Sequence, residues 1–101
     1  MNNTDFKITL MKHATRRIVE RIGVPKKAAK RQFKLALERG YVPGPNNVAL
    51  AQWVATMKGM HSDFQREGVI FNNHLFLFAS EKGIKTLITV LTVPNTFKGD
   101  F

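Results

Sequence analysis

The hydrophobic pattern of the first residues changes from a strand period to a helical one. Apolar and polar residues alternate over residues 6–10, which predicts a short strand. The next segment predicts a helix over about 11–22, whose buried stripe is formed by Met11, Ala14, Ile18 and Ile22. Gly23 ends this helix, because glycine readily takes the left-handed conformation found just past helix ends.

Two more helices follow with the same period. Pro25 suits the first turn of a helix over about 25–39, and Gly40 stops it. The inner face of this helix consists of Ala29, Phe33, Ala36 and Leu37. After a rigid turn over 41–45, Asn46 or Asn47 can cap a third helix over about 47–60. Its apolar side holds Leu50, Trp53, Val54, Met57 and Met60.

The last third of the chain returns to strand patterns. Three apolar runs predict strands over about 68–72, 75–80 and 86–93. Asn72, Asn73 and His74 predict a hairpin turn between the first two strands, because asparagine tolerates a positive φ. A second turn over 81–83 and Pro94 bound the last strand, which we expect to be central.

This order of elements predicts a single α+β domain over residues 1–101. A short N-terminal strand and three helices precede an antiparallel sheet, and we expect the helices to cover one face of it. Residues 87–93 are apolar on both faces of the last strand. The second face of the sheet is therefore expected to be partly covered by a tail segment or a second subunit.

The charge of the chain is concentrated at its amino-terminal end. Residues 1–40 carry eleven Lys and Arg against three acidic residues, which accounts for +8 of the net charge of +9. Such a one-sided field attracts a polyanion, so the expected partner is a nucleic acid, with RNA favoured, or a ribonucleoprotein. An acidic protein or a membrane surface is the alternative partner for the same charge. The oligomeric state stays open.

Several classes of site are excluded or disfavoured by composition. The chain has no cysteine, which excludes disulfides, thiolate zinc sites and a cysteine nucleophile. No apolar run is long enough to span a membrane, and residues 1–10 lack the apolar core of a signal peptide, so we expect a cytoplasmic protein. The motifs of phosphate-binding loops and of serine hydrolases are missing, and no cofactor is expected. His61 and His74 lack metal-ligand spacing, so no metal site is expected.

Charged side chains of the first helix form the candidate catalytic cluster. With about 100° per residue, one solvent-facing side of the helix carries His13, Arg16, Arg17, Glu20 and Arg21. Metal-free phosphodiester cleavage needs a group that moves a proton and cations that stabilise charge on the phosphate. The candidate catalytic residues are His13, Arg17, Glu20 and Arg21. The alternative is an ordinary set of salt bridges between Glu20 and the arginines that precede it.

A second basic face lies on the next helix and predicts phosphate contacts. The expected nucleic-acid-binding residues are Arg16, Lys26, Lys27, Lys30, Arg31, Lys34 and Lys85. The alternative is that much of this face is only a solvated helix surface. A helix-turn-helix module is a further alternative, because residues 22–25 join two basic helices. Its register is unfavourable, since the inward position would fall on Gln32 rather than on Phe33.

Two blocks of the sequence resemble a family of small bacterial and phage proteins with no assigned function. Residues 13–28 match its pattern HAxxRxxERxG followed by LPKKA, with Val24 in place of leucine, and residues 87–91 match its LITVL strand. The middle of the chain, about 41–66, has no counterpart, and residues 65–69 replace an expected Asn-Asn-Ile-Arg run. More distantly, the order of elements is similar to the RelE and colicin-type ribonuclease toxins. That resemblance implies metal-free RNA cleavage, with His13, Arg17 and Arg21 beside Lys85, Thr86 and Thr89 of the sheet.

Three functions therefore remain as hypotheses. The first is a metal-independent ribonuclease or toxin-like protein that acts on RNA or ribosomes. The second is a non-catalytic nucleic-acid-binding phage regulator. The third is a phage-type inhibitor that binds a host protein–nucleic-acid complex, for which a protein partner is required.

Overall fold

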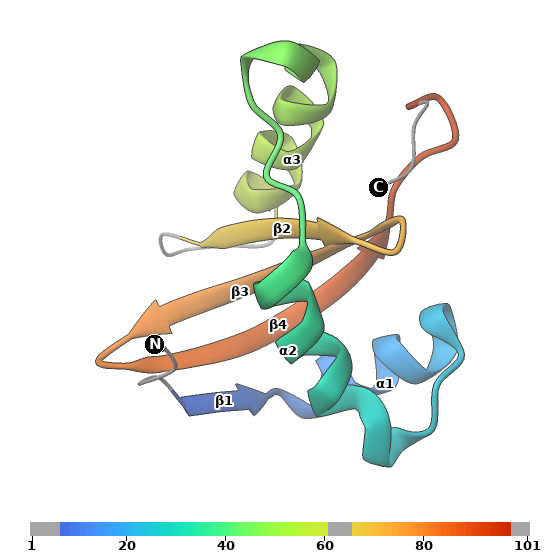
Figure 1. The fold of residues 1–101 in the computed structure, drawn as a ribbon, viewed down its shortest axis with the longest axis vertical. Coiled ribbons are helices and arrows are strands. Elements are labelled where there is room, and N and C mark those ends of the chain that lie inside the picture. Colours follow the sequence, from blue (N-terminus) through green and yellow to red (C-terminus); the bar gives the residue numbers. More distant parts are fainter. Residues whose placement is uncertain (1–6, 61–65, 98–101) are drawn as a thin grey trace.

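The computed structural model describes residues 7–60 and 66–97, and within them it confirms the predicted α+β class (Figure 1). The strands are β1 (Lys7–Leu10), β2 (Glu67–Phe71), β3 (His74–Glu81) and β4 (Ile84–Thr92). The α-helices are α1 (Lys12–Ile22), α2 (Ala29–Arg39) and α3 (Val48–Met60). Two 3-10 turns, η1 (Lys26–Ala28) and η2 (Pro45–Asn47), precede α2 and α3.

The ends of these elements lie close to the predicted ones. The helix predicted over 25–39 is divided into η1 and α2, since the first turn after Pro25 is a 3-10 turn, as is frequent at helix starts. The backbone N–H of Leu50 donates to Asn47 Oδ1 at 3.3 Å, so Asn47 rather than Asn46 caps α3. Phe6, the first residue of the predicted N-terminal strand, lies outside the described residues.

The four strands form one mixed sheet in the order β1-β4-β3-β2. The pairs β2–β3 and β3–β4 are antiparallel, as the hairpin pattern predicts. The N-terminal strand joins this sheet as well, because β1 pairs with β4 in parallel, with Lys7 opposite Ile84 and Leu10 opposite Leu87. β4 is therefore a central strand, as expected, and β1 is an edge strand.

The turn between β2 and β3 has the asparagine chemistry that the sequence predicts. Asn72 and Asn73 have φ values of 54° and 62°, and Phe71 pairs with His74. The loop is thus a two-residue turn with positive φ at both positions, the geometry that matches the twist of the flanking strands. His74 is the first residue of β3 and not part of the turn, which corrects the predicted three-residue turn.

A β-bulge in β4 changes which side chains face each layer. Leu77 pairs with Thr89 and Phe78 with Leu87, so Ile88 is the extra residue on β4. Beyond this bulge the alternation shifts by one position. As a result Leu87 and Val90, three positions apart, belong to the same buried cluster.

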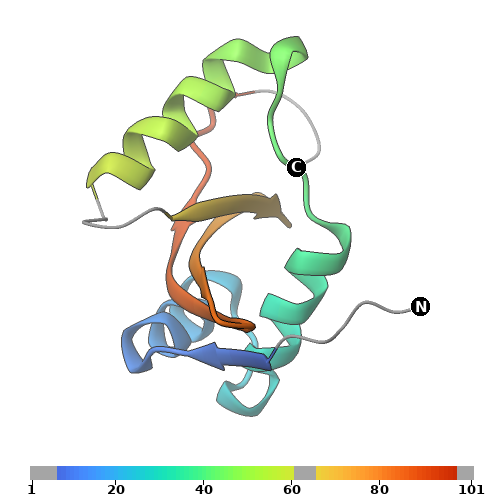
Figure 2. The same cartoon turned by 90° about the vertical axis from the view of Figure 1, so that its left-hand side faces the viewer.

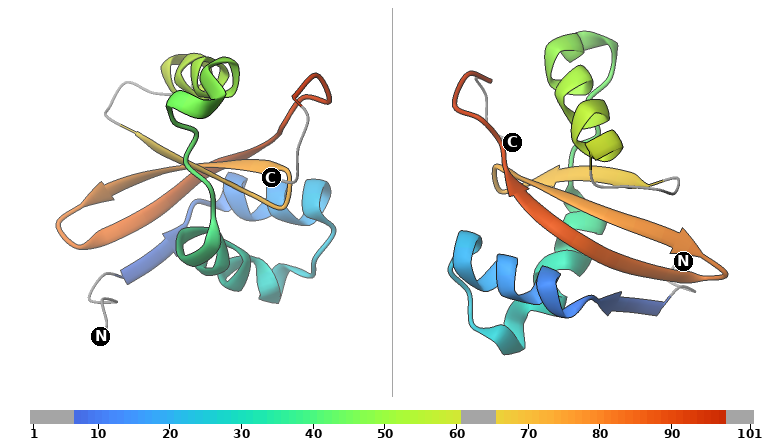
Figure 3. Two further views of the ribbon diagram at one scale, coloured as in Figure 1. Left: turned by 45° about the horizontal axis from the view of Figure 1, so that its top comes forward. Right: turned by 180° about the vertical axis from the view of Figure 1, so that it is seen from behind.

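The sheet separates two apolar layers, and this corrects the prediction that the helices cover one face. The first layer contains buried residues from α1, α2 and the sheet, which are Ala14, Ile18, Ala29, Phe33, Ala36, Val69, Phe76, Phe78, Leu87 and Val90. The second layer contains residues from α3 and the sheet, which are Leu50, Val54, Ile70, Leu75, Leu77 and Val93. Views of the ribbon from the front, side and back place α3 on the opposite side of the sheet from α1 and α2 (Figures 1, 2 and 3).

The physical reason for the two layers is the composition of β3. Its residues Leu75, Phe76, Leu77 and Phe78 are all buried, so both faces of the strand must be covered. α3 and the segment after β4 provide the second cover, and the rings of Trp53 and Phe97 lie 5.9 Å apart. The covering tail segment expected from the apolar strand is thus confirmed in Phe97.

Glycine at position 40, where α2 ends, is required by close packing and not by a left-handed backbone conformation. Its φ is −71°, a value that any residue adopts, so backbone conformation does not require glycine here. A Cβ atom at this position would collide with Val69 Cγ2 and the Ala36 carbonyl oxygen. The close passage of the chain over β2 therefore requires the missing side chain.

Candidate nucleic-acid interface

The amphipathic pattern of α1 sets which of its side chains reach solvent. Ala14 and Ile18 are completely buried against the sheet, whereas His13, Arg16 and Glu20 are exposed. The helix ends at Gly23, whose φ of 87° is left-handed and whose N–H donates to the Ile18 carbonyl at 3.3 Å. The predicted burial of Ala14 and Ile18 is confirmed, and Ile22 is half-buried. The predicted burial of Met11 is wrong, because Met11 is the extended residue before the first turn of α1 and its side chain is 47% exposed.

Arg17 and Glu20 pair with each other within α1. Arg17 Nη1 lies 2.9 Å from Glu20 Oε1, and the two side chains are 31% and 51% exposed. This is the local i,i+3 salt bridge that the sequence offers as the alternative to a catalytic role. It leaves the Glu20 carboxylate and the Arg17 guanidinium partly neutralised by each other.

Arg21 is bound to the sheet. Its Nη1 donates to the Val90 carbonyl oxygen at 2.6 Å. β1 pairs with β4 only as far as Leu87, so no strand reaches Val90 from that side within the described residues. The Arg21 guanidinium occupies the place of the backbone N–H that a longer β1 would have donated to Val90. It thereby connects the end of α1 to β4.

The structure therefore places the four candidate catalytic residues in three different settings. Arg17 and Glu20 form a surface pair, Arg21 is a tether to β4, and His13 is exposed one turn before Arg17. Among the described residues, His13 has no hydrogen-bond or charge partner. Within residues 7–60 and 66–97, no contact joins His13 or Arg21 to the Arg17–Glu20 pair, so a base, a clamp and an orienting group do not meet. The catalytic role remains a prediction.

The second set of predicted residues lies on the outer side of η1 and α2. Ala29, Phe33 and Ala36 are buried against the sheet. The opposite positions are all exposed and carry Lys26, Lys27, Lys30, Arg31 and Lys34. Together with the exposed Lys12 and Arg16 of α1, we call these side chains the cationic helix surface. The inward position is Phe33, with Gln32 only half-buried, which agrees with the register argument against a helix-turn-helix.

The cationic helix surface is almost free of compensating charge. The segment 12–39 contains ten Lys and Arg residues and two acids, Glu20 and Glu38. Of the ten basic residues, Arg17 alone has a carboxylate partner within the described part of the chain. Internal ion pairs therefore neutralise little of the positive charge.

Lys85 lies on β4 opposite Ile8 of β1, and contacts within the sheet hold its side chain. Its Nζ donates to Ser80 Oγ at 2.9 Å and lies 5.4 Å from the centre of the Phe78 ring. Phe78 in turn packs edge-on against Phe33 with a centroid distance of 5.5 Å. Lys85 thus lies half-buried on the sheet face that α2 covers, where packing contacts hold it in place.

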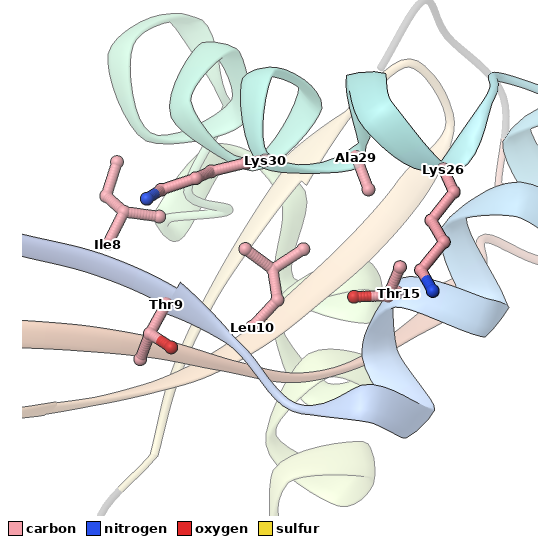
Figure 4. A pocket seen from close by; sticks show the side chains of 7 residues that line it. All are labelled: Ile8, Thr9, Leu10, Thr15, Lys26, Ala29 and Lys30. Carbon is pink, nitrogen blue, oxygen red and sulfur yellow. The ribbon is translucent and has the colours of Figure 1, made fainter.

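A hollow of about 300 Å³ opens between β1 and the start of α2. It is lined by Ile8, Thr9, Leu10, Thr15, Lys26, Ala29 and Lys30. Figure 4 shows Lys26 extending toward the start of α1, where Thr15 lies, and Lys30 extending along β1 toward Ile8. Thr9 and Thr15 are not among the predicted site residues, because no local sequence pattern links them to lysines of a later helix.

The remaining histidines give no metal site in the described residues. His74 Nδ1 lies 2.7 Å from the Asn72 carbonyl oxygen, within the hairpin itself. No group of three or more possible metal ligands occurs in residues 7–60 and 66–97. His61 lies outside the described residues. Within the same residues, no helix has both the length and the apolar character that a bilayer span requires.

Comparison of the chain with protein-family models, with curated proteins and with solved structures gives no match. The family resemblance and the similarity to ribonuclease toxins therefore remain predictions from the sequence, and function has to be argued from the surface itself.

Proposed function

We propose that the protein binds nucleic acid by contacts between the cationic helix surface and the phosphate backbone. The observation that carries this proposal is the segment 12–39, where ten basic residues face two acids and a single one of the ten has a carboxylate partner in the described chain. Unpaired exposed cations concentrate a polyanion and gain free energy by releasing its counterions.

The surface favours contact with phosphates over contact with bases. Among Phe, Tyr and Trp, the segment 12–39 contains only Phe33, and it is completely buried. Single-strand binders commonly stack bases on exposed aromatic rings, and the cationic helix surface carries none. Phosphate contacts position a nucleic acid but carry no sequence information. We therefore expect binding with weak sequence preference, to structured RNA or to duplex DNA.

Salt-dependent binding tests the proposal. Fluorescence anisotropy with a short labelled RNA duplex, a DNA duplex of the same sequence and a single strand gives the affinity at several salt concentrations. On the DNA duplex, log affinity should fall against log salt with a slope of about −0.9 for each phosphate contacted. A flat salt response, or no binding at low salt, would contradict the proposal.

Charge variants locate the binding surface. Replacing Lys26, Lys27, Lys30, Arg31 and Lys34 with glutamine should lower the affinity at moderate salt by at least about a hundredfold. A matched comparison uses two charges, with Lys27→Gln and Arg31→Gln set against Lys58→Gln and Lys82→Asn. Lys82 has φ of 52°, which asparagine tolerates, so this control keeps its turn. Equal losses in both pairs would mean that net charge, not this surface, determines binding.

A metal-independent ribonuclease is the second candidate, and the exposed position of His13 favours it. A free imidazole beside bound phosphates can accept a proton from a 2′-hydroxyl. The purified protein, incubated with total RNA and with ribosomes, should then cleave RNA, and His13→Ala should abolish cleavage while binding remains. Intact RNA in the presence of tight binding leaves the protein as a binding module.

A further inference from the structure

We infer that the hollow between β1 and α2 is a phosphate-binding site, and that it holds one phosphate of the bound nucleic acid more firmly than the rest of the surface does. This inference rests on the proposed function, because the ligand of the hollow is a phosphodiester of the same partner. It adds a specific site to a surface that would otherwise make only diffuse contacts.

The charge of the lining points to an anion. Lys26 and Lys30 approach the hollow from η1 and α2, and no acidic residue is among its seven lining residues (Figure 4). Neither lysine has a hydrogen-bond or ion-pair partner within the described residues. The two ammonium groups lie at opposite ends of the hollow, and each offers three N–H donors to the oxygens of an anion bound between them.

The Thr15 hydroxyl adds a neutral donor on the other side of the hollow. Thr9 lines the hollow as well, but its side chain points away from α2, on the face of β1 opposite to Ile8 and Leu10 (Figure 4). The Thr15 hydroxyl contacts the Met11 carbonyl at 3.5 Å, at the limit of a hydrogen bond, so it can turn toward a ligand at little cost.

The edge of β1 contributes backbone donors. Lys7 and Met11 donate their N–H groups to carbonyls of Gly83 and Leu87, next to and within β4. Backbone groups alternate in direction along a strand, so the N–H groups of Ile8 and Leu10 point away from β4. Both residues line the hollow, and the backbone hydrogen bonds of the described chain include none from this outer edge. The site thus combines two cations, the Thr15 hydroxyl and N–H groups of the outer edge of β1.

Two double variants on the same surface test the inference. Lys26→Gln with Lys30→Gln removes the two lysines of the hollow, and Lys27→Gln with Arg31→Gln removes two charges from the neighbouring positions outside it. We expect the first pair to lower duplex affinity at least about tenfold more than the second, because each removes the same charge but only the first removes the site. Thr15→Val, which removes the hydroxyl and keeps the shape, should lower affinity by a smaller factor.

Titration with inorganic phosphate provides a second arm that does not depend on nucleic-acid binding. Amide NMR signals of Ile8, Thr9, Leu10 and Thr15 should shift in wild type and not in the Lys26/Lys30 variant. Inorganic sulfate tests whether the site distinguishes phosphate from other tetrahedral anions, and a short polyglutamate peptide tests for an acidic protein segment.

Each outcome decides one of the two claims. Equal losses from the two double variants, with duplex binding intact in wild type, overturn the inference and leave the proposed function standing. Absence of duplex binding with phosphate shifts confined to the hollow overturns the proposed function but supports an anion site. Saturable shifts with polyglutamate and none with phosphate overturn the phosphate assignment in favour of a protein partner.

Discussion

The two helical layers that cover the sheet are alike in what they bury and opposite in what they expose. On one side, α1, η1 and α2 carry ten basic residues between positions 12 and 39. On the other side, α3 carries Lys58 as its one charged residue. Both layers bury large apolar side chains against β3, which is apolar on both faces.

This difference separates the requirements of folding from those of binding. An apolar strand needs cover on both sides, and α3 shows that a helix with a single charge supplies it. The positive charge of α1 and α2 is therefore not needed to build the sheet. Clustered like charges also repel one another, which lowers stability. A surface that lowers stability and is not needed for packing supports the proposed contact with an anionic ligand.

The largest expected loss of stability comes from truncating one buried side chain in each of the two layers. Phe33→Ala removes a completely buried ring that packs on Phe78, and we expect it to lower the free energy of unfolding by about 3–5 kcal/mol. Leu50→Ala in the α3 layer should cost about 2–5 kcal/mol. Urea denaturation followed by circular dichroism measures both values.

Nucleic-acid affinity should then distinguish the two variants. Phe33 positions α2, so in folded protein Phe33→Ala should weaken duplex binding, whereas Leu50→Ala should leave it unchanged. Phe33→Leu, which keeps most of the volume, is the control that should restore both properties in part. A Leu50→Ala protein that is folded but has lost binding would show that the two layers are not independent.

A smaller loss of stability is expected at the point where the chain passes from one layer to the other. Gly40→Ala places a Cβ against Val69 and the Ala36 carbonyl, and overpacking of this kind costs about 1–3 kcal/mol. Gly59→Ala is the matched control, since nothing lies near its added Cβ within α3. It should raise stability by about 0.5–1 kcal/mol, because alanine favours a helix over glycine. Equal effects at the two positions would contradict the close approach at Gly40.

The comparison of layers also explains which parts of the fold the sequence could predict. Local patterns were sufficient for the elements and turns, as in the Asn72–Asn73 hairpin and the burial of Ala14 and Ile18 in α1. They were insufficient for the assignment of α3 to the far face, because an apolar stripe does not say which side of a sheet it meets. The parallel pairing of β1 with β4 likewise depends on long-range contacts that no local pattern encodes.

The candidate site divides in the same way. Exposure of the lysines on α2 follows from helical period, and the structure confirms it. The hydrogen bond from Arg21 to Val90 could not be predicted from the sequence, because it depends on where β1 ends and on the bulge at Ile88. The hollow combines Thr9, Thr15 and two lysines, which come from the four elements β1, α1, η1 and α2, so it exists only in the folded chain.

Arg21 and Arg16 provide the next test, because they occupy the same helix in different roles. Arg21→Met leaves the Val90 carbonyl without its donor, and we expect a loss of about 1 kcal/mol, since water can partly replace the guanidinium. Arg16→Met removes an exposed cation and should leave stability unchanged while weakening duplex binding. Denaturation and anisotropy on both variants give the comparison, and identical profiles would contradict the assignment of Arg21 as a tether.

The smallest expected effect on stability gives a sensitive test of how charge is held on the surface. Glu20→Gln breaks the exposed pair with Arg17, which costs only about 0.2–0.5 kcal/mol. The variant should nonetheless bind nucleic acid more tightly, because the released guanidinium becomes available to a phosphate. The salt slope on a DNA duplex should become steeper by about 0.9 if one new phosphate is contacted.

Glu38→Gln is the matched control, since it removes the same charge from an exposed carboxylate of α2 that has no partner in the described residues. A general field effect would raise affinity equally in both variants, whereas a specific release of Arg17 raises it more in Glu20→Gln. The excess of the first variant over the second therefore measures how strongly the Arg17–Glu20 pair withholds a cation from the binding surface.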